Sequence, residues 1–126
     1  MQLRTPISHI KGLGSAKDGL GHWTMQRLTA IANLALIIWF LISAMTLAGA
    51  DYQETRAWLA SPVSASLMLL LIASVFYHAK LGLQVVIEDY VHHGGLKIAA
   101  LTVVTLVTLG LGVTCAVAVL KTSFAG

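Results

Sequence analysis

Two long runs of apolar residues, uninterrupted by charge, dominate the chain. Neither Leu28–Ala50 nor Ile98–Leu120 contains Asp, Glu, Lys or Arg, and each run is 23 residues long. A helix of about 20 apolar residues is enough to cross the hydrocarbon core of a bilayer, which is about 30 Å thick. The pattern therefore predicts that both runs form transmembrane helices.

A third apolar stretch covers residues 57–87, where His78 and Lys80 are the only titratable side chains besides Tyr77. Proline suits the first turn of a helix and a preceding serine can cap that turn, so this helix is expected to start at Pro62 with Ser61 as its cap. The prediction is an all-α membrane protein with three transmembrane helices, at residues 28–47, 62–90 and 96–120.

Charged residues at the ends of these runs predict the orientation. Residues 1–27 form a polar N-terminal arm, either loose or used for docking, residues 28–120 form the transmembrane domain, and residues 121–126 form a short tail. The arm carries four Lys or Arg residues, whereas the loop at residues 49–61 carries Asp51, Glu54 and only Arg56. Because positively charged segments stay in the cytoplasm, we expect the N-terminus there, although Lys121 lies near the opposite face.

The composition narrows the class of protein further. Hydrophobic residues make up 57% of the chain and charged residues only 10%, against about 25% charged in soluble domains. The net charge of +3 comes largely from the arm. Basic residues there would meet anionic lipid headgroups or an acidic partner, so we expect membrane lipid and no nucleic acid as a partner. Cys115 is the only cysteine, which excludes an intrachain disulfide and a cysteine-based metal cluster.

The segment from His78 to Tyr90 is the most informative part of the sequence. Placing an ionisable side chain at the bilayer midplane costs about 2.5 kcal/mol or more, so its presence there indicates a function by default. On a helix, Asp89 lies about 20° around from His78 and about 16 Å further along. Gly82 lies one turn after His78 on the same side and leaves room for a flat ring.

Two interpretations of His78 remain open on these grounds. It could pack between helices and form a hydrogen bond there, or it could bind a haem iron as an axial ligand, since neutral imidazole is a common ligand of haem iron. The other histidines lie outside the predicted spans: His9, His22, His92 and His93. A second histidine ligand at mid-membrane would therefore come from another chain.

The other candidate residues also have two interpretations each. Asp89 and Tyr90 could be the polar end of a helix, or a site where the Tyr90 hydroxyl bonds a quinone carbonyl and Asp89 tunes it or relays protons. Arg27 could anchor to headgroups or contact a haem propionate. Lys80 is rotated about 200° from His78, which favours snorkelling toward the interface or pairing with a partner subunit.

The sequence resembles, over nearly its whole length, the hydrophobic membrane anchor subunits of succinate dehydrogenase, respiratory complex II. Two segments carry the resemblance: His78-Ala-x-x-Gly82-x-x-x-Val86-x-x-Asp89-Tyr90, and His22 followed by Arg27-x-Thr-Ala-Ile before the first span. It implies that His78 binds haem b together with a histidine of a partner, that Arg27 lies near the propionates, and that Tyr90 and Asp89 lie at the ubiquinone site.

The resemblance also implies the partners and the location. The chain would join a cytochrome b556-type membrane subunit in a heteromeric helix bundle of the bacterial inner membrane. Iron–sulfur and flavoprotein subunits would carry the iron–sulfur clusters and FAD. The chain would not be an enzyme alone, because it has no flavin motif and no cysteine cluster of its own.

Three alternatives stay open. The chain could anchor a fumarate reductase, which runs the electrons in the opposite direction. It could be a small oligomeric proton channel or transporter subunit without haem, with His78, Lys80 and Asp89 as a relay. It could also be a purely structural anchor that has lost its haem. The reaction direction, the quinone type, trimer formation, the electron path through haem and the roles of Lys80 and His22 are not determined by the sequence.

Overall fold

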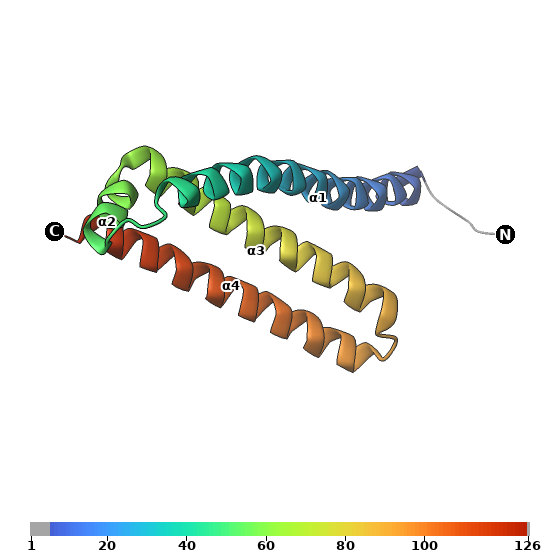
Figure 1. The fold of residues 1–126 in the computed structure, drawn as a ribbon. Coiled ribbons are helices and arrows are strands. Elements are labelled where there is room, and N and C mark those ends of the chain that lie inside the picture. The colour runs from blue at the N-terminus through green and yellow to red at the C-terminus, as the bar shows by residue number, and fades with distance from the viewer. Residues whose placement is uncertain (1–5, 126) are drawn as a thin grey trace.

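The computed structural model describes the backbone of residues 6–125 and the side chains of residues 20–125. This part of the chain forms four helices, labelled in Figure 1: α1 (Pro6–Thr46), α2 (Tyr52–Ala60), α3 (Pro62–Tyr90) and α4 (Gly94–Phe124). Three segments are long and apolar enough to cross a membrane, namely Leu20–Thr46, Pro62–Tyr90 and Gly94–Phe124. The predicted all-α class with three candidate transmembrane helices is confirmed.

The predicted start of the first helix at Leu28 is wrong. α1 begins at Pro6 and continues without a break into the apolar run. Hydropathy marks where a helix can enter hydrocarbon and not where the helix itself begins, and no second proline occurs before Pro62 to interrupt it. The cytoplasmic placement of residues 1–27 stays a prediction, and the side chains of Arg4, Lys11 and Lys17 lie outside the described residues.

The other helix ends match the predictions more closely. α3 has the predicted bounds, whereas α4 starts two residues before Leu96 and continues one turn past Leu120, so the predicted tail at 121–126 is largely helical. After α1 the chain turns through Gly49, whose φ of 83° lies in the left-handed region that glycine adopts without steric penalty.

The loop between the first two spans contains a short helix that the apolar pattern did not predict. Asp51 caps α2 in a capping box: its carboxylate accepts from the Glu54 N–H at 2.8 Å, and its own N–H donates to the Glu54 carboxylate at 3.3 Å. Trp58 of α2 stacks on Trp39 of α1, with ring centroids 5.7 Å apart. The connection between α1 and α3 is therefore an ordered structure.

We expect Asp51→Ala to destabilise α2 by about 1 kcal/mol, because it removes the side-chain acceptor of the capping box. The amide protons of the first turn of α2 should then exchange with solvent about fivefold faster, as measured by hydrogen exchange on the membrane-embedded protein. Asp51→Asn keeps an acceptor and serves as the control. Equal exchange rates in the wild type and the alanine variant would contradict a stabilising cap.

Ser61 links α2 to α3 through its backbone. It occupies the N-cap position of α3, with Pro62 in the first turn as predicted, but its side chain makes no capping hydrogen bond. Its backbone N–H donates to the carbonyl of Trp58 at 3.2 Å and so ends α2. Ser61 therefore holds the predicted cap position, but the expected role of its hydroxyl as a cap is wrong.

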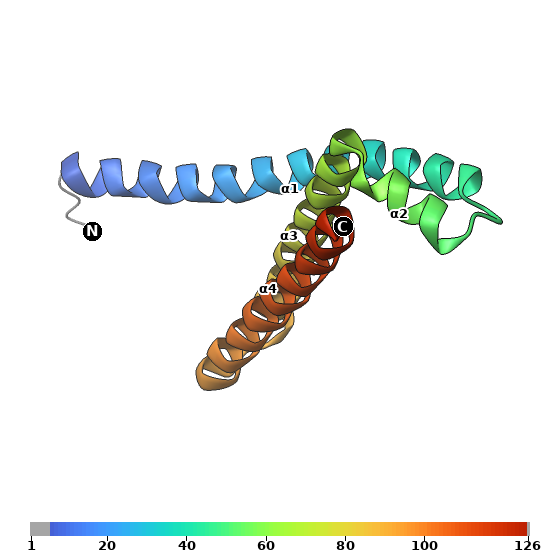
Figure 2. The same cartoon turned by 90° about the vertical axis from the view of Figure 1, so that its left-hand side faces the viewer.

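α3 is the central element of the bundle. It packs against α1 on one side and α4 on the other, and α1 crosses the α3–α4 hairpin obliquely (Figure 2). Few side chains are buried within the described part of the chain, and large hydrophobic residues are exposed on every span. Such a surface needs lipid or other apolar helices around it, as a membrane subunit requires.

Candidate functional site

A stripe of polar residues follows one side of α1 where this helix meets α3. Its members are spaced four, three and four positions apart, which places them on one face of a helix: His22, Gln26, Thr29 and Asn33. All four residues are at least partly buried, and Thr29 is only 7% exposed. We call this set the α1 polar stripe.

His78 lies opposite the α1 polar stripe and is half-buried between the two helices. Its ring Nδ1 lies 2.9 Å from the hydroxyl oxygen of Thr29. One turn earlier on α3, the Ser74 hydroxyl donates to the backbone carbonyl of Thr29 at 3.3 Å. The structure thus holds His78 in a polar contact between α1 and α3, within helices that are otherwise apolar.

Gly82 lies one turn beyond His78 on α3, near the Gln26 side chain of α1. A Cβ atom at this position would lie 4.0 Å from the Gln26 side-chain nitrogen, which is an ordinary contact distance. Three buried polar atoms of the stripe have no hydrogen-bond partner among the described residues: His22 Nε2, Gln26 Oε1 and Asn33 Oδ1. Buried polar groups are normally paired, so these three atoms stand out as unsatisfied within the described part of the chain.

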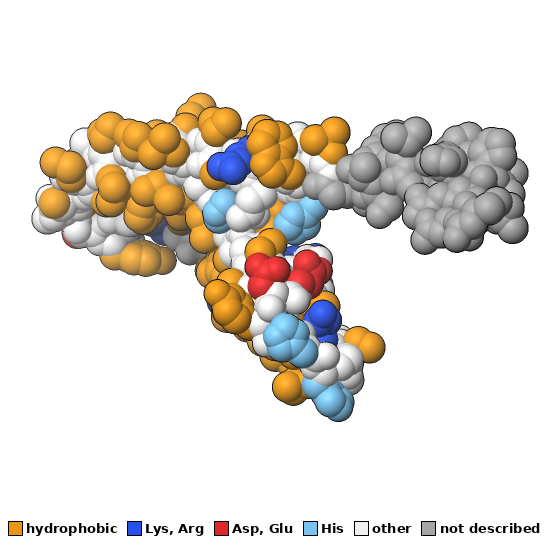
Figure 3. Space-filling model, turned by 90° about the vertical axis from the view of Figure 1, so that its right-hand side faces the viewer, with side chains coloured by type: hydrophobic (Ala, Val, Ile, Leu, Met, Phe, Trp, Pro, Cys, Tyr) orange, Lys and Arg blue, Asp and Glu red, His pale blue; other side chains and the backbone are white. Residues whose placement is uncertain are grey.

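Asp89 and Tyr90 lie at the end of α3 and do not contact His78. Both side chains are exposed, Tyr90 to 78%. Figure 3 shows acidic side chains on the α3–α4 hairpin beside hydrophobic ones, with histidines both further along the hairpin and next to α1. The structure therefore presents these two residues as a polar rim near a helix end.

Arg27 is exposed, and its guanidinium carbon lies 5.4 Å from the centroid of the Trp23 ring. Two positions along a helix correspond to a rotation of about 200°, so Arg27 points away from the side of α1 that carries Thr29. The structure does not bring Arg27 to His78 within this chain.

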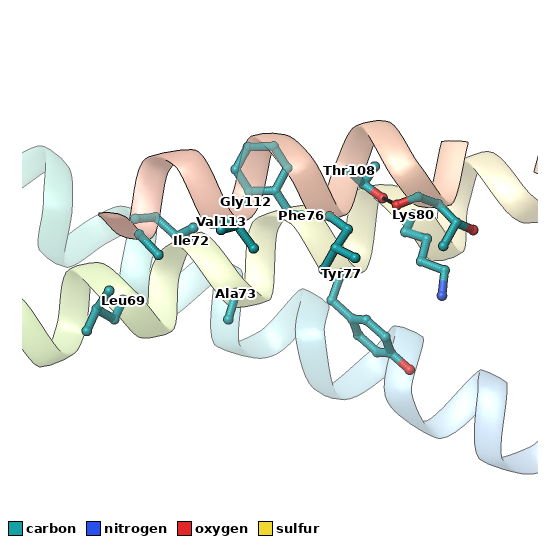
Figure 4. A pocket seen from close by; sticks show the side chains of 12 residues that line it. Leu69, Ile72, Ala73, Phe76, Tyr77, Lys80, Thr108, Gly112 and Val113 are labelled. Carbon is teal, nitrogen blue, oxygen red and sulfur yellow. Dashed lines mark hydrogen bonds between the residues drawn. The ribbon is translucent and has the colours of Figure 1, made fainter. Parts of the chain in front are cut away.

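Lys80 faces the other side of α3. It lines a groove of about 460 Å³ between α3 and α4, and its Nζ lies 6.0 Å from the centroid of the Tyr77 ring. Figure 4 shows this groove with Lys80 at one end and Leu69 at the other, and with Phe76 packed over Gly112. The predicted separation of Lys80 from His78 is confirmed, so the two do not share a site.

Sequence reasoning missed the two hydroxyl residues around His78. Thr29 appeared only as part of a motif, and Ser74 was not considered. The signal was present in the spacing of the α1 polar stripe, since four polar residues on one face of an apolar helix indicate a buried contact. Within the described residues no group of three or more His, Cys, Asp or Glu side chains could hold a metal ion by itself.

These features define a class of protein: a helical, multi-pass membrane protein in which His78 lies between two spans. His22, predicted to lie outside the spans, falls within the first candidate span, Leu20–Thr46, on the side of α1 that faces α3. The family model of the succinate dehydrogenase/fumarate reductase transmembrane subunit matches residues 1–119. The chain belongs to this family.

Relatives of known name agree with the family. A succinate dehydrogenase hydrophobic membrane anchor subunit of Rickettsia bellii is 34% identical over 106 residues, which cover 84% of this chain and 85% of that protein. The subunit of the same name in Rickettsia conorii is 33% identical over 82% of both chains. That of Paracoccus denitrificans is 28% identical over 79% of this chain and 77% of its own length. No solved structure matches significantly.

Proposed function

We propose that this chain is the hydrophobic membrane anchor subunit of a bacterial succinate:ubiquinone oxidoreductase. It holds a flavoprotein subunit and an iron–sulfur subunit at the membrane, and pairs there with a cytochrome b subunit. The family match and the printed names of the relatives support this proposal. The exposed apolar surface of its spans supports burial against both lipid and partner helices.

His78 is proposed as one axial ligand of haem b, shared with a histidine of the cytochrome b subunit. The observation that carries this role is the position of the ring: it is half-buried between α1 and α3, its Nδ1 is engaged, and no described residue bonds its Nε2. Imidazole nitrogen is a common ligand of haem iron. Bound there, the haem would supply a one-electron store.

Gly82 and Arg27 are proposed to accommodate the same haem from two sides. Gly82 presents no side chain one turn from His78, and a Cβ atom there would come no closer than 4.0 Å to the Gln26 side-chain nitrogen. Arg27 is exposed on the outer side of α1, where its guanidinium is available to a propionate only if the haem extends beyond this chain towards a partner.

Tyr90 and Asp89 are proposed to form part of the ubiquinone site. The exposed Tyr90 hydroxyl is free to donate a hydrogen bond to a quinone carbonyl, and the neighbouring carboxyl group is placed to relay protons, because quinone reduction consumes two protons. Their position at the end of α3 suits a substrate that enters from the apolar membrane and takes protons from water. With the N-terminus in the cytoplasm, this end of α3 lies on the cytoplasmic side.

A fumarate reductase anchor is the second candidate, because the family description covers both enzymes. The names of the relatives favour succinate oxidation. The two are separated by the ratio of succinate-driven quinone reduction to quinol-driven fumarate reduction in the purified complex.

The first test is a reduced-minus-oxidised visible spectrum of the protein purified gently from its native membrane, with the co-purifying chains identified. We expect a b-type haem signal together with flavin and iron–sulfur subunits. A preparation with neither haem nor these partners would overturn the proposal and leave the channel or transporter interpretation.

A further inference from the structure

The Thr29 hydroxyl has more close neighbours than it has protons. Its oxygen lies 2.8 Å from the Met25 carbonyl, 3.2 Å from the Gln26 carbonyl and 2.9 Å from His78 Nδ1. A hydroxyl group donates one hydrogen bond and accepts up to two. The direction of each bond can therefore be worked out.

The proton of the hydroxyl belongs to the contact with Met25. If it pointed to Nδ1 instead, the Thr29 and Met25 oxygens would face each other at 2.8 Å with lone pairs only. A carbonyl oxygen can only accept, whereas an imidazole nitrogen can donate or accept. Donation to the carbonyl satisfies both oxygens and leaves the hydroxyl oxygen as an acceptor towards the ring, so Nδ1 carries the ring proton.

This assignment determines the other ring nitrogen. A neutral imidazole has one N–H, so a proton on Nδ1 leaves Nε2 with a free lone pair, which is the form that binds a metal ion. Metal-binding histidines typically donate their other N–H to a neighbouring acceptor, which orients the ring. Because Thr29 is 7% exposed, water has little access to compete for this bond.

Ser74 strengthens the arrangement. Its hydroxyl donates to the Thr29 carbonyl at 3.3 Å, so α3 contacts Thr29 through both His78 and Ser74. Thr29 is thereby held in register with the histidine.

We propose that Thr29 is the positioning residue of the site: its hydroxyl oxygen accepts from His78 Nδ1, sets the tautomer and orientation of the ring, and keeps Nε2 available as a metal ligand. The identity of the metal group as haem rests on the proposed function. The tautomer of His78 does not.

Thr29→Val tests the proposal in the assembled complex, because valine keeps the shape of threonine and removes the acceptor. We expect haem to bind about 10- to 100-fold more weakly, as for loss of other partners that support a metal ligand, measured as transfer to an excess of a haem scavenger. The low-spin electron paramagnetic resonance signal of the haem should also shift, because the ring plane is no longer fixed.

Thr29→Ser is the matched rescue, since it keeps the hydroxyl, and should retain the wild-type signal and haem affinity. Ser74→Ala removes a hydroxyl from the same interface without touching the ring, and should shift the signal less than Thr29→Val does. A Thr29→Val complex with wild-type haem affinity and resonance signal would overturn the proposal.

A measurement on the unmutated full chain covers the case in which the valine variant does not assemble. In haem-free protein with ¹⁵N-labelled histidine, at mildly alkaline pH, the nitrogen shifts of His78 should show a protonated Nδ1 and an unprotonated Nε2. The His78 signals are identified by their loss in His78→Gln. The opposite tautomer would overturn the role of Thr29 whether or not the chain binds haem. Haem retention in a His78 variant, by contrast, would overturn only the proposed ligation.

Discussion

Replacing His78 by alanine is expected to abolish the b-type absorbance of the purified complex while all subunits remain assembled. Alanine removes the ligand itself, and loss of a supporting partner alone already costs about 10- to 100-fold in metal affinity. The haem content should therefore fall about tenfold or more. It is measured as haem per complex from the reduced-minus-oxidised spectrum, with subunit content determined on the same sample.

His92→Ala is the matched control for this experiment. His92 is exposed between α3 and α4 and makes no hydrogen bond among the described residues. His93 is a poorer control, because its Nδ1 accepts from the Leu96 N–H and caps α4. A normal haem signal in the His78 variant would refute ligation by this residue, and loss of the signal in the His92 variant as well would point to general destabilisation.

Tyr90→Phe is expected to slow quinone reduction about tenfold while the haem spectrum stays unchanged. The variant keeps the ring and removes only the hydroxyl, and one hydrogen bond to the reacting oxygen contributes about 1.4 kcal/mol, which corresponds to a factor of ten in rate. The measurement is succinate-driven reduction of a short-chain ubiquinone by the detergent-solubilised complex.

Two comparisons make this result specific. Succinate-driven reduction of a dye that takes electrons from the hydrophilic subunits should be unaffected, because these electrons never reach the quinone site. Tyr52→Phe provides a second exposed tyrosine, 68% exposed at the start of α2, and should behave like the wild type. Unchanged quinone kinetics in the Tyr90 variant would eliminate the proposed role of its hydroxyl.

Whether a prediction succeeded depended mainly on how far apart in the sequence the interacting residues lie. The bounds of α3 could be predicted because Pro62 and the polar residues after Ile87 are local signals that act within one or two turns. The start of α1 could not, because hydropathy reports the environment of a helix and not its continuity. α2 was missed although its capping box, Asp51 with Glu54, is a local signal in the sequence. The stacking of Trp58 on Trp39, which joins two helices, could not be predicted from local sequence.

The candidate site shows the same division. His78 and Lys80 could be separated by their angle around a single helix, and the structure places them on the α1 and α4 sides of α3. The pairing of His78 with Thr29 joins residues 49 positions apart. The spacing of the α1 polar stripe indicates a buried face, but it does not specify the partner, which depends on how two helices rotate and cross when they pack.

The sequence by itself thus determined that the chain is a helical membrane protein with three candidate transmembrane helices, one of which carries a histidine within its apolar stretch. Bilayer thickness and the cost of burying charge require runs of this length and polarity wherever they occur in a chain. The tertiary structure decided how α1 packs against His78, and with it the distance of 2.9 Å between the Thr29 hydroxyl oxygen and the ring Nδ1. The pairing of particular residues across the two helices is made by side-chain packing, which the polar pattern of one helix does not specify.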